Sequence, residues 1–160
     1  MSMELETSAE QRAGMLERTE WAAGLTWRQL VGIAKHMTAF KATKGSTVFE
    51  EGDREVSMGL VISGALGIFR KDMDGGRKLL VRLTRGQVFG DMALIDEGPR
   101  SASAVAENET VFLLVTRNDF FELINRTPRL GVELTLRIAR LLSSRLRDTS
   151  GRLCECLSTS

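Results

Sequence analysis

Hydrophobic residues in the first quarter of the chain recur at helical spacing. Residues 9–23 favour a helix, and Thr26 and Gln29 have the spacing of a capping box, so a second helix is expected to begin there. The apolar stripe of this second helix consists of Leu30, Ile33, Ala34 and Met37. His36 lies off the stripe and is expected to be exposed, and the polar residues 1–9 are expected to fray.

After residue 45 the pattern changes to the alternation that is typical of strands. Large apolar residues alternate with Ser, Gly and Ala, and β-branched and aromatic residues become frequent. The sequence Asp-Met-Asp-Gly-Gly at 72–76 is a strong hairpin signal. The predicted strands cover residues 47–49, a pair within 60–69, 78–83, a short segment ending at Phe89, 101–106 and 110–115.

Helical spacing returns at the end of the chain. Thr116 and Asp119 form a capping signal, and Thr127 and Pro128 end that helix and begin the last one, which is expected to run to about Thr149. Apolar residues lie on more than one side of this last helix, at Val132, Leu134, Leu136, Ile138, Ala139, Leu141, Leu142 and Leu146. The pattern indicates a partner helix, with packing inside its own domain as the alternative.

The predicted fold class is α+β, mainly β. It is an antiparallel β-roll or jelly-roll barrel with N-terminal helices and a long C-terminal helix. A chain of 160 residues is long enough for one domain with a substantial core. We expect an N-terminal tail and helix over 1–20, the main domain over 21–150, and a disordered tail over 151–160 that follows a helix end near Gly151.

Composition excludes several function classes. The chain is 42% hydrophobic and 27% charged, as in soluble globular proteins, and its net charge of +1 gives no general attraction to nucleic acid or anionic membranes. No apolar run approaches the length of a membrane span, and the polar N-terminus is not expected to be a signal peptide. One histidine and two tail cysteines, Cys154 and Cys156, do not supply a metal site, so no metal and a reducing cytoplasm are expected.

The side chains that could bind a ligand are concentrated between residues 86 and 106. This stretch has small or flexible residues at both ends and contains one cation, Arg100, one carboxylate, Asp91, and the hydroxyls of Ser101 and Ser103. A guanidinium beside exposed backbone amides suits a phosphate, and a carboxylate suits a hydroxyl donor such as a ribose. The alternatives are that Arg100 is a solvated surface charge and that Asp91 only caps the short segment behind it.

Two runs within this stretch, Phe89–Ile95 and Pro99–Ala102, resemble the phosphate-binding cassette of cyclic nucleotide-binding domains. The resemblance extends over about residues 20–150 and implies an eight-stranded β-roll that binds a cyclic nucleotide without changing it chemically. The ligand-binding residues that it implies in the cassette are Phe89, Gly90, Asp91, Met92, Ala93, Arg100, Ser101 and Ala102.

The resemblance assigns roles within this set. Arg100 pairs with the cyclic phosphate, Gly90 and Ala102 offer backbone amides, and Asp91 faces the ribose. The family has a glutamate where this chain has Asp91, whose oxygens retreat by about 1.3 Å because one methylene is missing. Affinity is then expected to fall by about ten- to a hundredfold, since a charged hydrogen bond is lost, unless the loop sits closer and compensates.

The resemblance also suggests the ligand and the assembly. Ser101 is similar to the serine of the bacterial catabolite activator branch, which binds cAMP, so cAMP is expected, with cGMP as the alternative. Thr149 and Ser150 are candidate adenine contacts, or else an ordinary helix end. The dimer contacts that it implies on the last helix are Ile138, Leu142 and Leu146. Because the given sequence ends at Ser160, no DNA-reading helix-turn-helix is expected.

The leading prediction is a stand-alone cytoplasmic regulatory domain. It would bind a cyclic nucleotide, form a homodimer through the last helix, and couple ligand binding to movement of that helix, without contacting DNA or membrane. One alternative is an interaction module that has lost its ligand, and another is the effector fragment of a transcription regulator. An enzyme is not expected, because the carboxylates of Asp91, Asp96 and Glu97 have no nearby His, Cys or Lys partner in the sequence.

Overall fold

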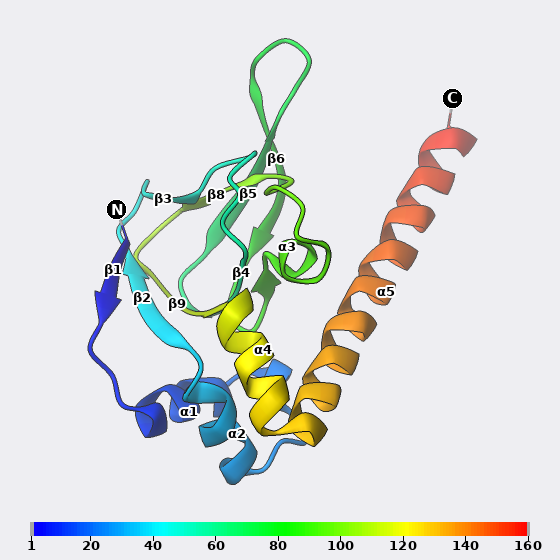
Figure 1. The fold of residues 1–160 in the computed structure, drawn as a ribbon. Helices are drawn as coiled ribbons and strands as arrows, with labels where there is room; N and C mark the ends of the chain where they lie inside the picture. Colours follow the sequence, from blue (N-terminus) through cyan, green and yellow to red (C-terminus); the bar gives the residue numbers. More distant parts are fainter. Residues whose placement is uncertain (1, 160) are drawn as a thin grey trace. The chain divides into compact units, whose positions relative to one another are not determined.

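The protein is described by a computed structural model that covers residues 2–159 (Figure 1). It divides into two compact units, Met1–Glu122 and Leu123–Ser160. The first unit contains every described strand and helices α1 to α3. Helix α4 begins in the first unit, and helix α5 lies wholly in the second.

The N-terminal helices follow the prediction in part, because the helix expected over 9–23 ends at Glu17 and a separate 3₁₀ helix follows it. They are α1 (Ala9–Glu17), the 3₁₀ helix η1 (Glu20–Ala22) and α2 (Trp27–Ala34). The predicted capping box is confirmed, because Thr26 Oγ1 accepts from the Gln29 N–H and Gln29 Oε1 accepts from the Thr26 N–H. Helices α1 and α2 pack against each other and bury one face of each (Figure 1). His36, expected to be exposed, is half-buried just after α2.

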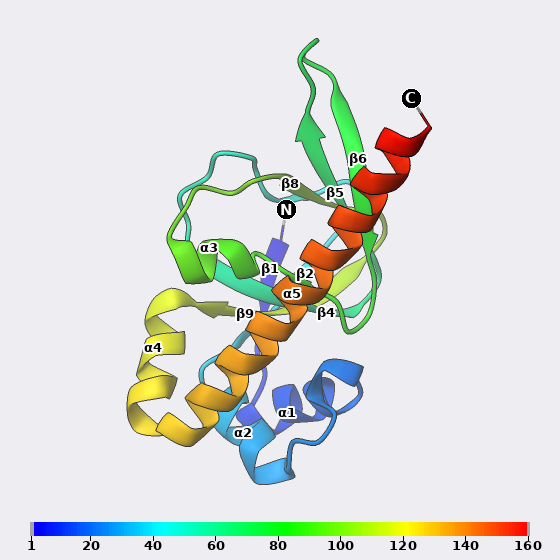
Figure 2. The same cartoon turned by 90° about the vertical axis from the view of Figure 1, so that its right-hand side faces the viewer.

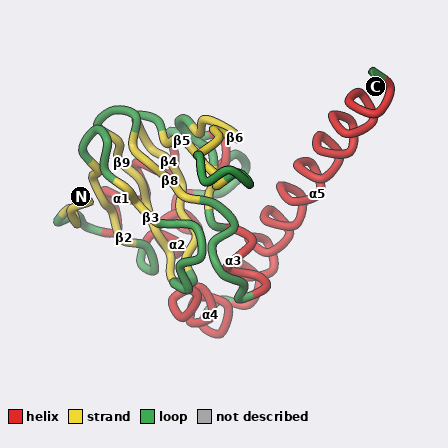
Figure 3. Tube along the Cα trace, turned by 90° about the horizontal axis from the view of Figure 1, so that it is seen from above, coloured by secondary structure: helices red, strands yellow, loops and turns green. Residues whose placement is uncertain are grey.

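Strands of the first unit form two antiparallel sheets (Figure 3). The five-stranded sheet has the order β1-β2-β9-β4-β7, and the four-stranded sheet has the order β3-β8-β5-β6. The strands within the described residues are β1 (Ser2–Leu5), β2 (Thr38–Ala42), β3 (Thr47–Phe49), β4 (Ser57–Ser63), β5 (Leu66–Lys71), β6 (Arg77–Leu83), β7 (Val88–Phe89), β8 (Ser103–Ala106) and β9 (Thr110–Thr116).

The hydrophobic core lies between the two sheets. The five-stranded sheet contributes Ala42, Val61, Phe89 and Phe112, and the four-stranded sheet contributes Phe49, Leu66, Leu83, Ala104 and Ala106. The Phe49 and Phe89 rings stack across the core with their centroids 5.7 Å apart, and Phe89 meets Phe112 edge-on at 5.6 Å. The predicted β-roll is therefore confirmed, although it is two facing sheets with nine described strands instead of a closed barrel of eight.

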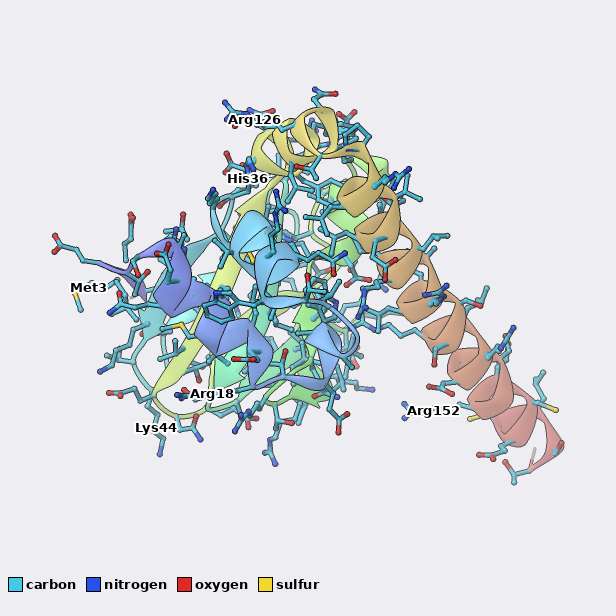
Figure 4. The ribbon with its side chains drawn as sticks, turned by 90° about the horizontal axis from the view of Figure 1, so that it is seen from below. Met3, Arg18, His36, Lys44, Arg126 and Arg152 are labelled. Atoms are coloured by element: carbon cyan, nitrogen blue, oxygen red, sulfur yellow. The ribbon has the colours of Figure 1, made fainter. Side chains whose placement is uncertain are left out.

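The N-terminal segment differs from its prediction. Residues Ser2–Leu5 were expected to fray, but they form β1 and pair antiparallel with β2. The sheet explains the difference, because β2 would otherwise be an edge strand with unpaired backbone groups. Met3 points away from the rest of the unit (Figure 4) and is 62% exposed, so backbone pairing and not side-chain burial positions this strand.

The predicted hairpin at 72–76 is confirmed and joins β5 to β6. Asp72 Oδ1 accepts from the backbone N–H groups of Asp74 and Gly76, at 3.0 and 2.8 Å, and Gly75 has φ of 82°. This hairpin projects beyond the other strands of the first unit (Figures 1 and 2). Its turn is encoded locally, since the carboxylate and the glycines that it needs are adjacent in the sequence.

Gly59 in β4 leaves space for the Phe89 ring in the core. A Cβ atom built on Gly59 would overlap the ring of Phe89, which lies directly against the backbone there. We expect Gly59→Ala to lower the free energy of unfolding by about 1–3 kcal/mol, the cost of overpacking a core. Urea denaturation measures this change.

The matched control is Gly14→Ala in α1, where nothing lies within 4 Å of the added Cβ. Alanine is the better helix former, so this variant is expected to gain up to about 1 kcal/mol of stability. Equal unfolding midpoints for the two variants would contradict the assigned packing.

Two helices end the chain. Helix α4 (Arg117–Arg126) begins at the predicted cap, where Thr116 Oγ1 accepts from the Asp119 N–H at 3.2 Å. Helix α5 (Pro128–Ser158) starts with proline in its first turn, as predicted, although the Thr127 side chain makes no capping bond. Among residues 2–159, no helix is both long and apolar enough to cross a bilayer.

The predicted end of the last helix near Gly151 is wrong. Helix α5 continues through Gly151 to Ser158, and Cys154 and Cys156 are exposed thiols on that helix instead of parts of a disordered tail. A glycine inside a helix costs only about 1 kcal/mol relative to alanine. The helix-favouring Arg152, Leu153, Glu155 and Leu157 that follow can offset that cost.

Candidate functional site

The backbone of Arg100 is bonded to the loop that connects β3 and β4. The Arg100 N–H donates to the Asp53 carbonyl at 2.8 Å, and the Gly52 N–H donates to the Arg100 carbonyl at 2.9 Å. Gly52 in this loop has φ of 91°, a left-handed conformation that favours glycine. These two bonds place Arg100 beside the start of β4.

The Arg100 side chain is buried, and only 5% of the residue is exposed. Its Nη1 donates to the Ser57 carbonyl and its Nη2 donates to Ser57 Oγ, both at 2.7 Å. The guanidinium carbon lies 4.2 Å from the centroid of the Phe49 ring. Nε is buried and has no hydrogen-bond partner among the described residues. Arg100 is therefore not a solvated surface charge, because it is fixed inside the fold with donor capacity unused.

The electrostatics of Arg100 follow from this position. Burial lowers the pKa of the guanidinium, and the negative charges of Glu55 and Asp53 act in the opposite direction. Arginine keeps its proton at neutral pH even when buried. The site therefore holds a permanent, poorly hydrated cation with an unused N–H, and such a group favours an anionic oxygen ligand.

Gly90 makes the approach to Arg100 possible. It has φ of 74°, a left-handed conformation that favours glycine. A Cβ atom there would overlap Arg100 Nη1 and come within 2.5 Å of the Ser57 carbonyl oxygen. The glycine that the sequence analysis selected is thus required both by the turn and by the space around the guanidinium.

Helix α3 (Asp91–Asp96) follows Gly90 and contacts β4 (Figure 2). Asp91, its first residue, is only 2% exposed. Met92 is 53% exposed, whereas Ala93 is buried. The stretch after β7 is therefore one short helical turn with its carboxylate on the inside, and the structure brings Gly90, Asp91 and Arg100 into one region of the first unit.

The other predicted residues of this stretch occupy different environments. The Phe89 side chain lies in the core, stacked on Phe49. Ser101 is exposed, and Ala102 is buried. Ser103 Oγ accepts from the Glu51 N–H at 2.8 Å, so this hydroxyl stabilises the β3–β4 loop. Of the two hydroxyls in the stretch, only that of Ser101 faces solvent.

Sequence reasoning missed Arg117, which connects α3 to α4. Its Nε donates to the Leu94 carbonyl at 3.3 Å, and its Nη1 pairs with the Glu97 carboxylate. Its guanidinium carbon also lies 4.6 Å from the centroid of the Phe121 ring. Glu97 ends α3 in a left-handed conformation, with φ of 58°. Nothing in the spacing of these residues could have signalled the contact.

Phe49 and Ser57 were also missed as parts of the site. Phe49 was predicted from the sequence only as part of a strand, and Ser57 lies 43 residues before Arg100. Their proximity to the guanidinium depends on how β3 and β4 are placed in the two sheets. No local motif contains that information.

Thr149 and Ser150, the predicted base contacts, lie on α5 in the second unit. Both are exposed, and Thr149 Oγ1 donates to the Arg145 carbonyl at 2.8 Å. Their role as adenine contacts stays a prediction. Of the expected dimer contacts, Ile138 is wrong, because it is only 1% exposed within the single chain and cannot reach a partner, whereas Leu146 is 68% exposed. Contacts of Leu142 and Leu146 with a partner stay a prediction.

A metal centre and a surface hollow are two further possibilities for a functional site. Among residues 2–159, no group of three or more His, Cys, Asp or Glu side chains is placed to hold a metal ion. A shallow hollow of about 580 Å³ lies on the four-stranded sheet, away from Arg100. It is lined by Lys44, Gly45, Ala65, Phe69, Arg82, Val105, Ala106, Glu107 and Asn108. The Arg82–Glu107 ion pair lies within this lining.

Comparison with known proteins connects this geometry to a family. The model of the cyclic nucleotide-binding domain matches residues 40–127, more than half of the chain. The matched region includes Phe49, Ser57, Gly90 and Arg100. Both sheets contribute strands to it.

One similar protein is the cyclic AMP receptor protein of Thermus thermophilus. The two are 41% identical over 105 residues, which are 66% of this chain and 47% of that protein, so this chain spans about half the length of that relative. The crystal structure of the Thermus thermophilus catabolite activator protein superposes with a TM-score of 0.75 at 35% identity, over 86% of this chain and 62% of that one.

A second solved structure supports the fold. A cyclic nucleotide-binding domain from Methylobacillus flagellatus superposes with a TM-score of 0.82 over 94% of this chain and 86% of that chain. The identity is 22%, so this comparison bears on the architecture alone.

Proposed function

This chain belongs to the cyclic nucleotide-binding domain family, and we propose that it is a regulatory domain that binds cAMP at Arg100. The observation that carries the proposal is the buried guanidinium, whose Nε has no partner among the described residues. A cyclic phosphate is a monoanion with two exocyclic oxygens, and it would supply the acceptors that this cation lacks. The ligand is released unchanged.

The family resemblance suggests the remaining roles in the first unit. Gly90 and Ala102 would donate backbone N–H groups to the phosphate, and Asp91 would accept from the ribose 2′-hydroxyl. Ser101, exposed beside Arg100, would favour cAMP over cGMP. Phe89, Met92 and Ala93 would shape the turn around the sugar and phosphate.

Two relatives support the choice of nucleotide. The Thermus thermophilus protein is a cyclic AMP receptor, and a 28% identical relative in Mycobacterium tuberculosis is a cAMP-activated regulator. We extend this property to the present chain because Arg100, Gly90 and the turn between them are intact. We further propose that the domain acts in the cytoplasm.

The proposal for the second unit concerns signalling. Helix α5 carries exposed apolar side chains along its length, including Val132, Leu136, Leu146, Leu153 and Leu157. Such a helix favours a partner helix, so we propose a homodimer through α5, with Thr149 and Ser150 as base contacts. Cyclic nucleotide would act by binding one position of α5 more tightly than another.

Thermal unfolding with and without nucleotide tests the binding proposal. Ligand at about 100 times its Kd adds about 2.7 kcal/mol to the free energy of unfolding. For a domain of this size, that corresponds to a rise in Tm of about 5–10 °C. We expect this rise with cAMP and a smaller one with cGMP at equal concentration.

The matched control ligand is 5′-AMP, which has the same base and sugar but an open, more highly charged phosphate. It is expected to leave Tm within about 1 °C of the free protein, because the proposed contacts suit a cyclic monoanion and not an open dianion. If neither cyclic nucleotide raises Tm, the binding proposal is wrong.

One observation favours a second candidate function. Ser57 already uses two of the N–H donors of Arg100, and Asp91 is buried and one methylene shorter than the family glutamate. A β-roll with these contacts could be an interaction module that no longer needs a ligand. The absence of any shift with cyclic nucleotides would select this function.

A further inference from the structure

We infer that Phe49 and Ser57 orient the Arg100 guanidinium before any ligand arrives and thereby determine which phosphate oxygen it binds. We call these two residues the guanidinium seat. This inference rests on the proposed function, because it concerns how the same site recognises its ligand. It makes Phe49 and Ser57 positioning residues, since both act through Arg100.

The first part of the seat fixes one edge of the guanidinium. Ser57 is the first residue of β4 and is 1% exposed. Its carbonyl accepts from Nη1 and its hydroxyl accepts from Nη2, each at 2.7 Å. Two acceptors on one buried residue bond two nitrogens of a rigid plane, so this edge cannot rotate without breaking both bonds.

The second part of the seat fixes the face of the guanidinium. The Phe49 ring lies 4.2 Å from the guanidinium carbon, well within the range of a cation–π interaction. Phe49 belongs to β3 in the four-stranded sheet, whereas Ser57 belongs to β4 in the five-stranded sheet. The two sheets therefore fix Arg100 from different sides.

The ring of the seat is itself held in place by the core. Phe49 stacks on Phe89, and the Phe89 ring lies against the backbone of Gly59, where no Cβ atom interferes. On the other side, Gly90 approaches so closely that any side chain there would overlap Arg100 Nη1. Arg100 therefore has little space for a second rotamer.

The donors that remain define the recognition. A guanidinium has five N–H groups, and Ser57 accepts from two of them. The Nε–H is buried and unused among the described residues. A guanidinium that is held in one orientation presents its remaining N–H groups in one direction. It therefore distinguishes the two exocyclic oxygens of a cyclic phosphate. Preset orientation also means that little side-chain freedom is lost on binding.

Phosphorothioate analogues of cAMP test this directional recognition. The Rp and Sp diastereomers differ only in which exocyclic oxygen is replaced by sulfur, a weaker acceptor. We expect the unmodified protein to bind one diastereomer about tenfold more tightly than the other, as expected for the loss of one charged hydrogen bond. Calorimetry gives both affinities and their ratio.

Variants of the guanidinium seat are expected to lose the preference for one diastereomer. Phe49→Leu removes the ring, and Ser57→Ala removes one acceptor, and each is expected to weaken cAMP binding about tenfold. In both variants the affinities for Rp and Sp analogues should converge to within about twofold, because Arg100 can then turn toward either oxygen. Ser57→Thr keeps the hydroxyl and is expected to restore the ratio.

Phe40→Leu is the matched control for loss of a core ring. Phe40 stacks on Phe112 at 5.7 Å, whereas the ring that faces Arg100 is that of Phe49. Phe40→Leu removes an aromatic ring from the core, as Phe49→Leu does, but it should keep the diastereomer ratio of the unmodified protein. A purely structural role for Phe49 predicts instead that both leucine variants behave alike.

The seat can also be tested without ligand, by NMR of protein labelled with ¹⁵N-arginine. The Arg100 guanidinium carbon lies 4.2 Å from the centroid of the Phe49 ring, and Nε is buried. The Nε–H proton signal is therefore expected to be shifted upfield and to exchange slowly with water. Phe49→Leu should remove the upfield shift, and Phe40→Leu should retain it. This measurement does not depend on nucleotide binding.

The outcomes separate the two proposals. If no cyclic nucleotide binds the unmodified protein, the proposed function fails, and the NMR experiment alone decides whether the seat exists. If cAMP binds but Phe49→Leu and Ser57→Ala keep both the affinity and the diastereomer ratio, the inference is overturned. An Arg100 Nε–H signal at the position typical of solvent-exposed arginines would overturn it as well.

Discussion

Arg100→Ala is expected to abolish cAMP binding, with an affinity loss of at least about a hundredfold. The side chain is the buried cation of the site, and its open N–H groups would donate two hydrogen bonds to the phosphate. Each hydrogen bond to a charged group contributes about 1.5–3 kcal/mol, so two contribute about 3–6 kcal/mol, or about 10²–10⁴ in Kd. Isothermal titration calorimetry of the two proteins measures the difference.

Arg100→Lys separates charge from geometry. Lysine keeps the positive charge but lacks the planar fork that bonds Ser57 and the phosphate together. We expect it to recover only a small part of the affinity that alanine loses. Binding by Arg100→Ala that equals the unmodified protein would contradict the assigned site.

Arg100→Met shows whether loss of binding reflects unfolding. Burial lowers the Arg100 pKa, which means that the folded protein disfavours the charged form relative to the unfolded chain. This cost is present at every pH below the folded pKa and is relieved only as the pH rises above it. An apolar replacement removes the cost, so the ligand-free variant is expected to melt no lower than the unmodified protein.

Asp91→Ala is expected to remove the preference for a ribose over a deoxyribose. If Asp91 accepts from the 2′-hydroxyl, the unmodified protein should bind cAMP about ten- to a hundredfold more tightly than 2′-deoxy-cAMP. In the variant, cAMP affinity should fall to that of the deoxy analogue, and the affinity for the deoxy analogue should hardly change. Competition binding with both nucleotides gives the two ratios.

Asp96→Ala is the matched control for Asp91→Ala. Asp96 is the last residue of the same helix, is exposed, and accepts from the Gly98 N–H at 2.8 Å. It should leave the preference for ribose intact. If the preference is the same in the unmodified protein and in Asp91→Ala, then Asp91 does not contact the sugar, and its buried carboxylate is structural.

The sequence by itself determined those features whose partners lie within a few residues of one another. The Asp72 turn, the Thr26–Gln29 capping box and the Thr116–Asp119 cap each appear as predicted. The positions of the strands after residue 45 and the turn after Phe89 were also readable, because alternation and glycine positions are local signals. The resemblance of the cassette then indicated the family and identified Arg100 as the expected phosphate-binding residue.

Only the tertiary structure decided what surrounds Arg100. Ser57 and Phe49 precede it by dozens of residues and lie in different sheets. Which side chains of β3 and β4 meet the guanidinium depends on strand register, and a shift of one residue would turn every side chain to the other face. The pairing of Ser2–Leu5 and the contact of Arg117 with Glu97 depend on the fold in the same way.

The physical reason is the range over which each interaction acts along the chain. Caps, turns and helix periodicity are fixed by contacts within one or two turns of backbone, so a local pattern is sufficient to predict them. Packing in the core joins residues that are distant in sequence, and many arrangements are compatible with the same local preferences. Burial of the whole core selects one of them, and that choice places Arg100 against Phe49 and Ser57.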